Sequence, residues 1–310
     1  MKIVEKAEVF EKLSPAACIT VMRSALTQLE EGRATQYLRT VTKLPSGGLM
    51  GYMPAAVEGA FGAKLITIFH SNTGTQYPSH QGSILLFDAQ YGSLLASVDG
   101  GAVTEIRTGT VSALATDLLA VPGAKHLAIL GAGAQGRSHL LAIREVRQLE
   151  KVTVWDLDPE KARRFAEEMS KATGLPVTAC ESAAAAVDGA DIICTVTPSH
   201  TPILERAWVK PGAHINAVGA CAAPDRELAG DLVAAAAVYC DNRESVYAEG
   251  GDFLIPLKEG LFSDDHLLGT LGELALGRLP GRRDPAQITL FEALGLAVED
   301  IACAQYICSL

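Results

Sequence analysis

Three glycines in the stretch AILGAGAQGRSH, residues 128 to 139, have the spacing of a phosphate-binding turn. Gly131, Gly133 and Gly136 follow the apolar run KHLAILG and precede the amphipathic run RSHLLAIREVRQLE. This pattern predicts strand, turn and helix, with a pyrophosphate at the helix N-terminus. The first glycine permits the bend, the second admits the phosphate and the third lets helix and strand pack closely. A tight turn without a nucleotide is the alternative, and the flanking pattern favours the phosphate site.

An acidic residue follows at the distance that a dinucleotide site requires. The run KVTVWDLD predicts a second strand that ends in Asp156, about 20 residues past the last glycine. A carboxylate there accepts hydrogen bonds from both ribose hydroxyls, and it would repel a 2′-phosphate. The sequence therefore favours NAD as the cofactor over NADP.

Two further loops are expected near the nicotinamide. Open α/β sheets bind ligands outside the carboxyl ends of their strands. Thr195 and Thr197 lie where CTVTPSHTPIL leaves one expected strand, and Gly219 and Cys221 lie where INAVGACAAP leaves the next.

Three cations outside the nucleotide fold lie in apolar or β-branched surroundings. Arg39 in YLRTVTK is either an outward-facing strand residue or an anion ligand. Lys64 in GAKLITIF is costly to bury alone, so it lies on a wet face or holds an anion. Arg107 is the first residue of RTGT, just before an expected helix start, and its guanidinium suits bidentate carboxylate binding. Together the three cations predict a small acidic substrate.

No metal site is expected, because the seven histidines and seven cysteines lack ligand spacing and no C-x-x-C occurs. Glu249 and Asp252, in the glycine loop AEGGDF, would either reach the active site or face water.

These residues require two kinds of architecture to position them. The first third predicts a helix with Ser14 as N-cap and Gly32 past its end, and then an antiparallel meander of β-branched strands. A helix over TGTVSALATDLLAVPG, ending at Pro122, begins an alternation of strands and helices. In it, RSHLLAIREVRQLE is expected to place one apolar face on Leu140, Leu141, Ile143, Val146 and Leu149. The expected strands are 126–131, 151–156, 176–180, 191–196, 213–218 and 236–241.

The predicted fold class is α/β, with a Rossmann doubly wound parallel sheet inserted in a strand-rich α+β domain. The Rossmann NAD-binding domain covers residues 114–293. The substrate and dimerisation domain covers 1–113 and 294–310, since GLAVEDIACAQYICSL is an apolar helix with no strand after it.

Composition excludes several other classes of protein. With 310 residues, 48% hydrophobic side chains and a formal charge of −10, the chain suits a two-domain enzyme and has no basic stripe for nucleic acid or anionic membranes. No apolar run is long enough to span a bilayer, and the charged start MKIVEKAEVFEKL does not suit a signal peptide. A cytoplasmic location is expected.

Longer motifs carry a family resemblance. LRTVTK, GYMPA, AKLITIF, YPSHQGSILLFDAQYGSLLASVDG, IRTGTVSALAT, LGAGAQ, WVKPGAHINAVGA and GLAVEDIA together resemble the ornithine cyclodeaminase/mu-crystallin family, over nearly the whole chain. The resemblance implies a homodimer, formed by the strand-rich domain, and hydride transfer between a nicotinamide and an α-amino or α-imino carbon. It also implies that Arg39, Lys64 and Arg107 hold the substrate carboxylate. The positions that it implies for cofactor contacts are Ser79, Gly133, Ala134, Gln135, Asp156, Thr195, Val218 and Leu296.

One departure from the family pattern affects the expected reaction. True cyclodeaminases resemble this chain at INAVG but continue with an aspartate where this chain has Cys221. A thiol is mostly neutral at pH 7 and replaces a carboxylate poorly, so we interpret Cys221 as a small residue beside the cofactor rather than as a nucleophile.

The sequence thus predicts an NAD(H)-dependent enzyme that reduces a small α-imino (ketimine) carboxylate or oxidises the matching amino acid. One alternative is ornithine cyclodeaminase, which converts L-ornithine to L-proline and ammonia. Another is a non-catalytic binding protein of mu-crystallin type.

Overall fold

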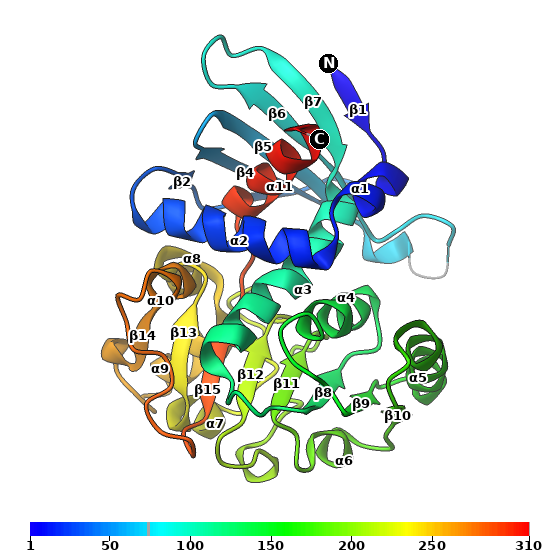
Figure 1. Ribbon diagram of the computed structural model, residues 1–310, viewed down its shortest axis with the longest axis vertical. Helices are drawn as coiled ribbons and strands as arrows, with labels where there is room; N and C mark the ends of the chain where they lie inside the picture. Colours follow the sequence, from blue (N-terminus) through cyan, green and yellow to red (C-terminus); the bar gives the residue numbers. More distant parts are fainter. Residues whose placement is uncertain (73–74, 310) are drawn as a thin grey trace. The chain divides into compact units, whose positions relative to one another are not determined.

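The structure is a computed structural model that describes residues 1–72 and 75–309. The chain divides into two compact units, which we call unit 1 (residues 1–107 and 295–310) and unit 2 (residues 108–294). The first division falls inside helix α3 (Gly100–Leu119), and the second falls before the C-terminal helix (Figure 1). In the described residues, no helix combines the length and the apolar character needed to cross a membrane.

Unit 1 is a mostly antiparallel sheet with helices on one face (Figure 1). Its strands are β1 (Lys2–Val4), β2 (Thr35–Gln36), β3 (Thr40–Lys43), β4 (Leu49–Val57), β5 (Ala60–Ile68), β6 (His80–Asp88) and β7 (Leu94–Asp99). Its helices are α1 (Lys6–Lys12), α2 (Pro15–Glu30), the 3₁₀ turn η1 (His70–Asn72), the start of α3, and α11 (Ala297–Ser309). The order is β1-β7-β6-β5-β4-β2, with β3 also paired to β4, so the predicted meander is confirmed. The parallel pairing of β1 with β7 was not predicted.

The core of unit 1 follows from strict alternation along its strands. Met53 and Ala55 of β4, Ile84 of β6 and Val98 of β7 are buried, whereas their chain neighbours are more exposed. Helix α11 packs on β4, β5 and β6 and against α2. Helix α2 begins as predicted, because the Ser14 side chain accepts a hydrogen bond from the Ala17 amide.

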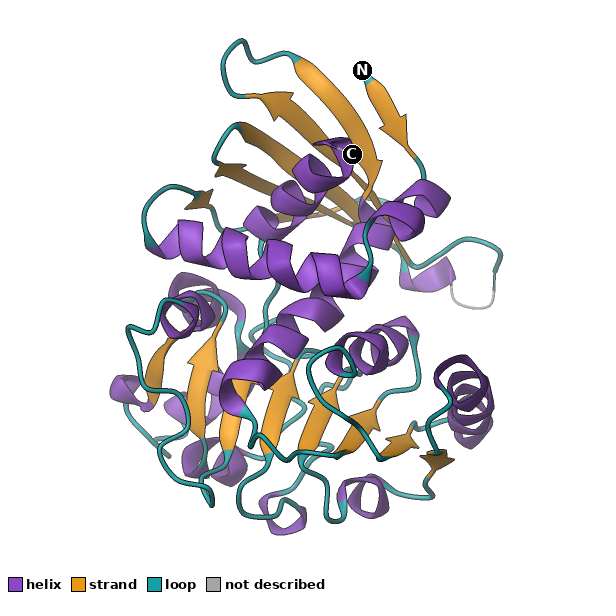
Figure 2. Ribbon diagram, in the orientation of Figure 1, coloured by secondary structure: helices purple, strands orange, loops and turns teal. Residues whose placement is uncertain are grey.

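Unit 2 is a wholly parallel sheet, as predicted, and helices lie in front of it and behind it (Figure 2). Its strands are β8 (His126–Leu130), β9 (Lys151–Trp155), β10 (Val177–Ala179), β11 (Ile192–Thr195), β12 (His214–Ala217), β13 (Ala237–Cys240), β14 (Leu267–Thr270) and β15 (Thr289–Glu292). Its helices are the rest of α3, α4 (Ala134–Ile143), α5 (Pro159–Thr173), α6 (Ala183–Val187), α7 (Gly230–Ala235), α8 (Arg243–Glu249), α9 (Gly251–Lys258) and α10 (Leu271–Ala275). Short 3₁₀ turns are η2 (Arg206–Trp208) and η3 (Asp264–His266).

The strand order of unit 2 is β10-β9-β8-β11-β12-β15-β13-β14. The six predicted strands are confirmed to within one residue at each end. Two strands, β14 and β15, were missed, and β15 lies between β12 and β13. The order reverses between β8 and β11, and this switch point is where dinucleotide folds bind their ligand.

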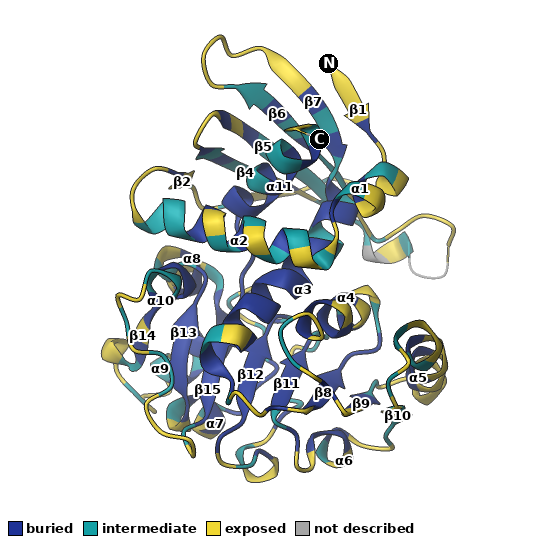
Figure 3. Cartoon of the chain, viewed as in Figure 1, coloured by how far each residue is buried: buried dark blue, intermediate teal, exposed yellow. Residues whose placement is uncertain are grey.

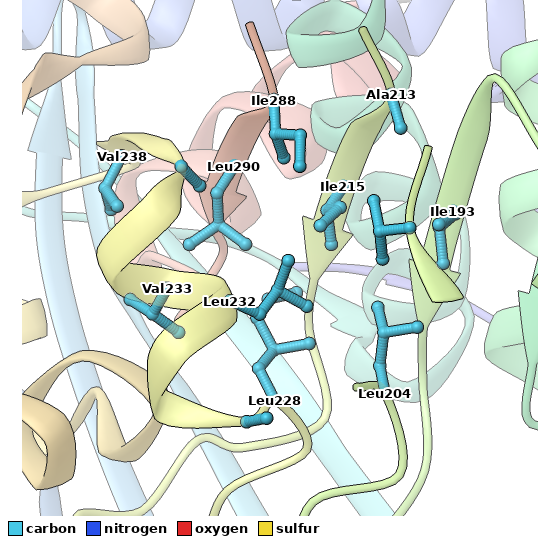
Figure 4. Packing of buried hydrophobic residues seen from close by; sticks show 14 of the residues in the cluster. Ile193, Leu204, Ala213, Ile215, Leu228, Leu232, Val233, Val238, Ile288 and Leu290 are labelled. Atoms are coloured by element: carbon cyan, nitrogen blue, oxygen red, sulfur yellow. The ribbon is translucent and has the colours of Figure 1, made fainter. Parts of the chain in front are cut away.

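Burial explains why these strands have continuous apolar sequences. Strands β8, β11 and β12 are buried at every position, because helices cover both sheet faces (Figure 3). On one face, Leu232 and Val233 of α7 pack with Leu204, Ile215 and Leu290 (Figure 4). The strands are therefore fixed rigidly beneath the loops that follow them.

Two helix predictions need correction. Helix α3 begins at Gly100, earlier than expected, because Asp99 accepts a hydrogen bond from the Ala102 amide and caps the first turn. Helix α4 ends at Ile143, so Val146 and Leu149 lie beyond it, and Leu141 is exposed, so the expected apolar face was wrong at these three positions.

Candidate functional site

The glycine turn of unit 2 joins β8 to α4 at the switch point. Gly131 has φ +117°, and a Cβ there would lie 2.7 Å from the Val196 carbonyl oxygen, so no other residue fits without strain. Helix α4 begins at Ala134, and its N-cap, Gly133, provides no side-chain cap. The amides of the first turn, including those of Ala134 and Gln135, can therefore receive an anion.

The other two glycines have different tasks. A Cβ on Gly136 would lie 2.4 Å from the Gly131 carbonyl oxygen, so glycine is needed for α4 to pack on the turn. A Cβ on Gly133 would meet nothing within 4 Å. The open side of Gly133 leaves the space that a pyrophosphate needs, and the turn fits a dinucleotide.

Asp156 lies after β9, beside the glycine turn. Its carboxylate accepts hydrogen bonds from the amides of Ala132 (2.8 Å) and Asp158 (3.1 Å), and Lys161 Nζ lies 3.0 Å away. Partial burial raises the pKa of Asp156, but these amides and the ammonium group outweigh it and lower the pKa overall. Asp156 is thus an anion in the position where a ribose diol is expected.

The loops after β11 and β12 contain the remaining predicted cofactor residues of unit 2. Thr195 is fully buried at the end of β11, and Thr197 follows it in the loop. Val218 is buried, whereas Gly219 is partly exposed. The half-buried Cys221 donates its thiol to the Val218 carbonyl oxygen at 3.1 Å. This contact supports our interpretation of Cys221 as a small residue within the loop.

Lys64 is in the middle of β5 in unit 1, on the buried face of the sheet. It is paired across the sheet with the buried residues Met53 and Ile84, and only 2% of its surface is exposed. Its ammonium group lies 2.6 Å from Asp300 Oδ2 and donates a hydrogen bond to Thr104 Oγ1 at 3.3 Å. Of the two alternatives for Lys64, a wet sheet face is therefore excluded.

Arg107 also pairs with acidic residues of helix α11. Its Nη1 lies 3.1 Å from Glu299 Oε2, and its Nε lies 3.3 Å from Asp300 Oδ1. All four charged side chains of this ion cluster, Lys64, Arg107, Glu299 and Asp300, are at least 94% buried. A buried network of this kind fixes each guanidinium and ammonium group in one direction.

Arg39 joins the ion cluster through Gly295. Arg39 lies in the loop between β2 and β3, and its Nη2 donates to the Gly295 carbonyl oxygen at 3.3 Å. A Cβ on Gly295 would lie only 2.5 Å from Arg107 Nη1. The structure thus brings together the three cations predicted from the sequence.

The environment of Lys64 changes its acidity. Burial lowers the pKa of Lys64 to about 8, the negative charge of Asp300 opposes this effect, and Arg107 adds to it. Lys64 is therefore mostly an ammonium ion at pH 7 and loses its proton at a lower pH than an ordinary lysine does.

Glu299 and Asp300 are the members of the ion cluster that we missed from the sequence. The signal was present in GLAVEDIA, because two adjacent acids in an otherwise apolar helix cannot be buried without cationic partners. Their sequence separation from Lys64 and Arg107 concealed the pairing.

Two predicted cofactor residues belong to unit 1. Ser79 precedes β6, and its hydroxyl lies 3.0 Å from His80 Nδ1. Leu296 is fully buried, and its amide donates to Glu299 Oε2 at 3.4 Å. Contact of either residue with a dinucleotide stays a prediction.

His139 has a structural role. His139 is buried against Ser112 and the Gln135 carbonyl, and burial lowers its pKa to about 4. No group of three or more potential metal ligands occurs within 1–72 and 75–309.

Comparison with known proteins identifies the family. The sequence pattern of the ornithine cyclodeaminase/mu-crystallin family matches residues 1–309, so the chain belongs to this family. It is 42% identical to ketimine reductase mu-crystallin of Mus musculus over 280 residues, which cover 89% of this chain and 85% of the relative. It is 37% identical over 258 residues to Delta(1)-pyrroline-2-carboxylate reductase of Bacillus cereus, covering 82% of this chain and 79% of that protein.

Comparison with solved structures also finds a reductase. The Delta(1)-pyrroline-2-carboxylate reductase of Thermococcus litoralis, in complex with NADH and L-proline, superposes with a TM-score of 0.96. It is 36% identical in sequence, and the alignment covers 100% of this chain and 97% of that chain.

Proposed function

We propose that this protein is an NAD(H)-dependent reductase of small cyclic α-imino carboxylates, which also oxidises the matching amino acids. The chain is an NAD-dependent imine reductase of its family, since its relatives are reductases of this chemistry and one was solved with NADH. The observation that carries the finer proposal is the gathering of Arg39, Lys64 and Arg107 around α11, which suits a substrate with a carboxylate.

Arg39 and Arg107 would bind the substrate carboxylate, and the planar guanidinium groups would fix its orientation. Lys64 would donate a hydrogen bond to the substrate or a proton to the imine nitrogen, since its pKa of about 8 lies close to working pH. Fixing the reacting carbon in this way removes much of the entropic barrier, about 7–11 kcal/mol in well-oriented reactions.

The cofactor site of unit 2 would hold NAD through three features. The turn Gly131, Gly133 and Gly136 with the first-turn amides of α4 would bind the pyrophosphate, and Asp156 would bind the ribose hydroxyls. The loops with Thr197 and Gly219 would receive the nicotinamide. When bound, the nicotinamide supplies the hydride for the imine carbon.

Each unit would have a separate role, with unit 2 binding NAD and unit 1 binding substrate and forming a homodimer in the cytoplasm. The exposed apolar residues on one face of the unit 1 sheet support the proposal of a homodimer. Met50, Tyr52, Phe61 and Leu95 are 40–48% exposed, and they alternate with buried residues. Phe61 also stacks on Phe87, with ring centroids 5.4 Å apart. Light scattering after size exclusion tests the proposal, and a monomeric mass would contradict it.

The test of the reaction is NADH oxidation by the purified protein. Cyclic ketimine carboxylates with five- and six-membered rings are supplied in parallel with pyruvate or glyoxylate plus an amine. Oxidation with a cyclic ketimine supports the proposal. Silence in every assay, together with release of ammonia from L-ornithine and catalytic NAD, would make the protein a cyclodeaminase despite Cys221. Saturable binding of ligand without any turnover would make it a binding protein.

A further inference from the structure

Glu227 connects the two loops that follow β11 and β12. Its side chain is fully buried. Oε1 accepts hydrogen bonds from Thr197 N (2.7 Å) and Thr197 Oγ1 (2.6 Å), and Oε2 accepts one from Gly219 N (2.8 Å). A single carboxylate thus binds donors from two loops that are separate in the sequence.

The loops are packed tightly around this carboxylate. A Cβ on Gly219 would lie 2.1 Å from the Thr197 carbonyl oxygen and 2.6 Å from Glu227 Cδ. At Gly219 the loops thus lie close to each other as well as to Glu227, and no larger residue fits at position 219.

Glu227 is itself fixed from the opposite side. Asp252 Oδ1, in α9, accepts hydrogen bonds from the amides of Glu227 (2.8 Å) and Leu228 (2.7 Å). The Glu227 carbonyl oxygen accepts from the Ile203 and Leu204 amides. The sequence left open whether Asp252 reaches the active site or faces water. Asp252 is buried in unit 2, where it supports Glu227, and does not face water.

We propose that Glu227 is a positioning residue that holds the loops containing Thr197 and Gly219 in the arrangement that receives the nicotinamide. The inference rests on the proposed function, which places the nicotinamide at these loops. A carboxylate accepts hydrogen bonds at both oxygens, whereas an amide of the same shape accepts at one and donates at the other. Only the acid can therefore hold donors from both loops.

The test compares two ligands of the full-length protein. NADH requires both the glycine turn and the nicotinamide loops, whereas ADP-ribose lacks the nicotinamide and depends on the turn alone. We expect Glu227→Gln to weaken NADH binding by about tenfold or more, since buried hydrogen bonds to charged groups are strong. Binding of ADP-ribose should change less than about twofold. Titration calorimetry measures both affinities.

Glu273→Gln is the matched control in unit 2. The Glu273 carboxylate also accepts a backbone hydrogen bond, from Thr270 N at 2.9 Å, but it belongs to the capping box of α10. This variant should bind NADH as the wild type does. If Glu227→Gln does not fold, Thr197→Val removes one donor to Glu227 and should weaken NADH binding severalfold without affecting ADP-ribose.

The outcomes separate the two proposals. Equal weakening of NADH and ADP-ribose, or unchanged NADH binding, would overturn the role of Glu227 while leaving the reductase proposal intact. Wild-type protein that binds no NADH would overturn the proposed function, and the positioning role with it.

Discussion

The two proposed binding regions of this protein consist of different chemical groups. In unit 2, the dinucleotide turn is made of backbone groups within one short stretch, from Gly131 to Gly136. In unit 1, the ion cluster is made of charged side chains from β5, α3 and α11. A binding site made of backbone groups needs positions without side chains, so that the ligand can approach. A buried charge is stable only when each of its charged partners is present. The two regions should therefore fail in different ways when they are mutated.

Arg107→Ala should have the largest effect. It removes a proposed ligand of the substrate carboxylate and leaves Glu299 and Asp300 buried with too little positive charge. We expect KM to rise, kcat to fall and the free energy of unfolding to drop by about 3–5 kcal/mol. Steady-state kinetics and urea unfolding measure these effects. Arg33→Ala is the control, because Arg33 pairs with Glu31 and Glu58 at the surface and should lose less than about 1 kcal/mol. Unchanged kinetics would remove Arg107 from the site.

A pair of alanine substitutions tests the backbone site. Gly133→Ala meets no protein atom, so the melting temperature of the apoprotein should stay the same while NADH affinity falls about tenfold or more. Gly136→Ala forces α4 away from the Gly131 carbonyl and should cost about 1–3 kcal/mol of stability before any ligand is added. If both variants lost stability equally, the separate roles of these glycines would be wrong.

Asp156→Ser should change cofactor choice rather than stability. Removing the carboxylate ends its repulsion of a 2′-phosphate, and Lys161, which is 3.0 Å from Asp156 Oδ2, becomes a cation for that phosphate. The ratio of kcat/KM for NADPH to that for NADH should rise about tenfold. Adding Lys161→Ala should reverse part of the gain. A ratio that does not change would show that Asp156 does not select the cofactor.

Asp300→Asn should change kcat/KM mainly above pH 7. Asp300 raises the pKa of Lys64 against the effects of burial and Arg107, so its loss lowers this pKa below about 8. Because binding of a carboxylate needs the ammonium form, the basic limb of kcat/KM against pH should move to lower pH. Glu58→Gln, an exposed substitution in unit 1, should leave the profile in place. A fixed profile in Asp300→Asn would exclude Lys64 as the titrating group.

The fold of unit 2 was largely predictable, because continuous apolar strands and glycine turns are local signals. Strand β15 (Thr289–Glu292) was not, since its place between β12 and β13 comes from tertiary pairing. The extra length of α3 likewise depends on Asp99, which ends β7 and caps the first turn of the helix.

In the candidate site, too, the features with local sequence signals were predictable and those that depend on tertiary pairing were not. The sequence alone determined the glycine turn, the acid after β9 and the three cations, because each is defined by residue type and local spacing. Only the tertiary structure decided that Glu299 and Asp300 neutralise Arg107 and Lys64, and that Glu227 joins the Thr197 and Gly219 loops. The physical reason is that a buried charge or donor must have a partner, but its residue type does not specify which distant segment supplies it.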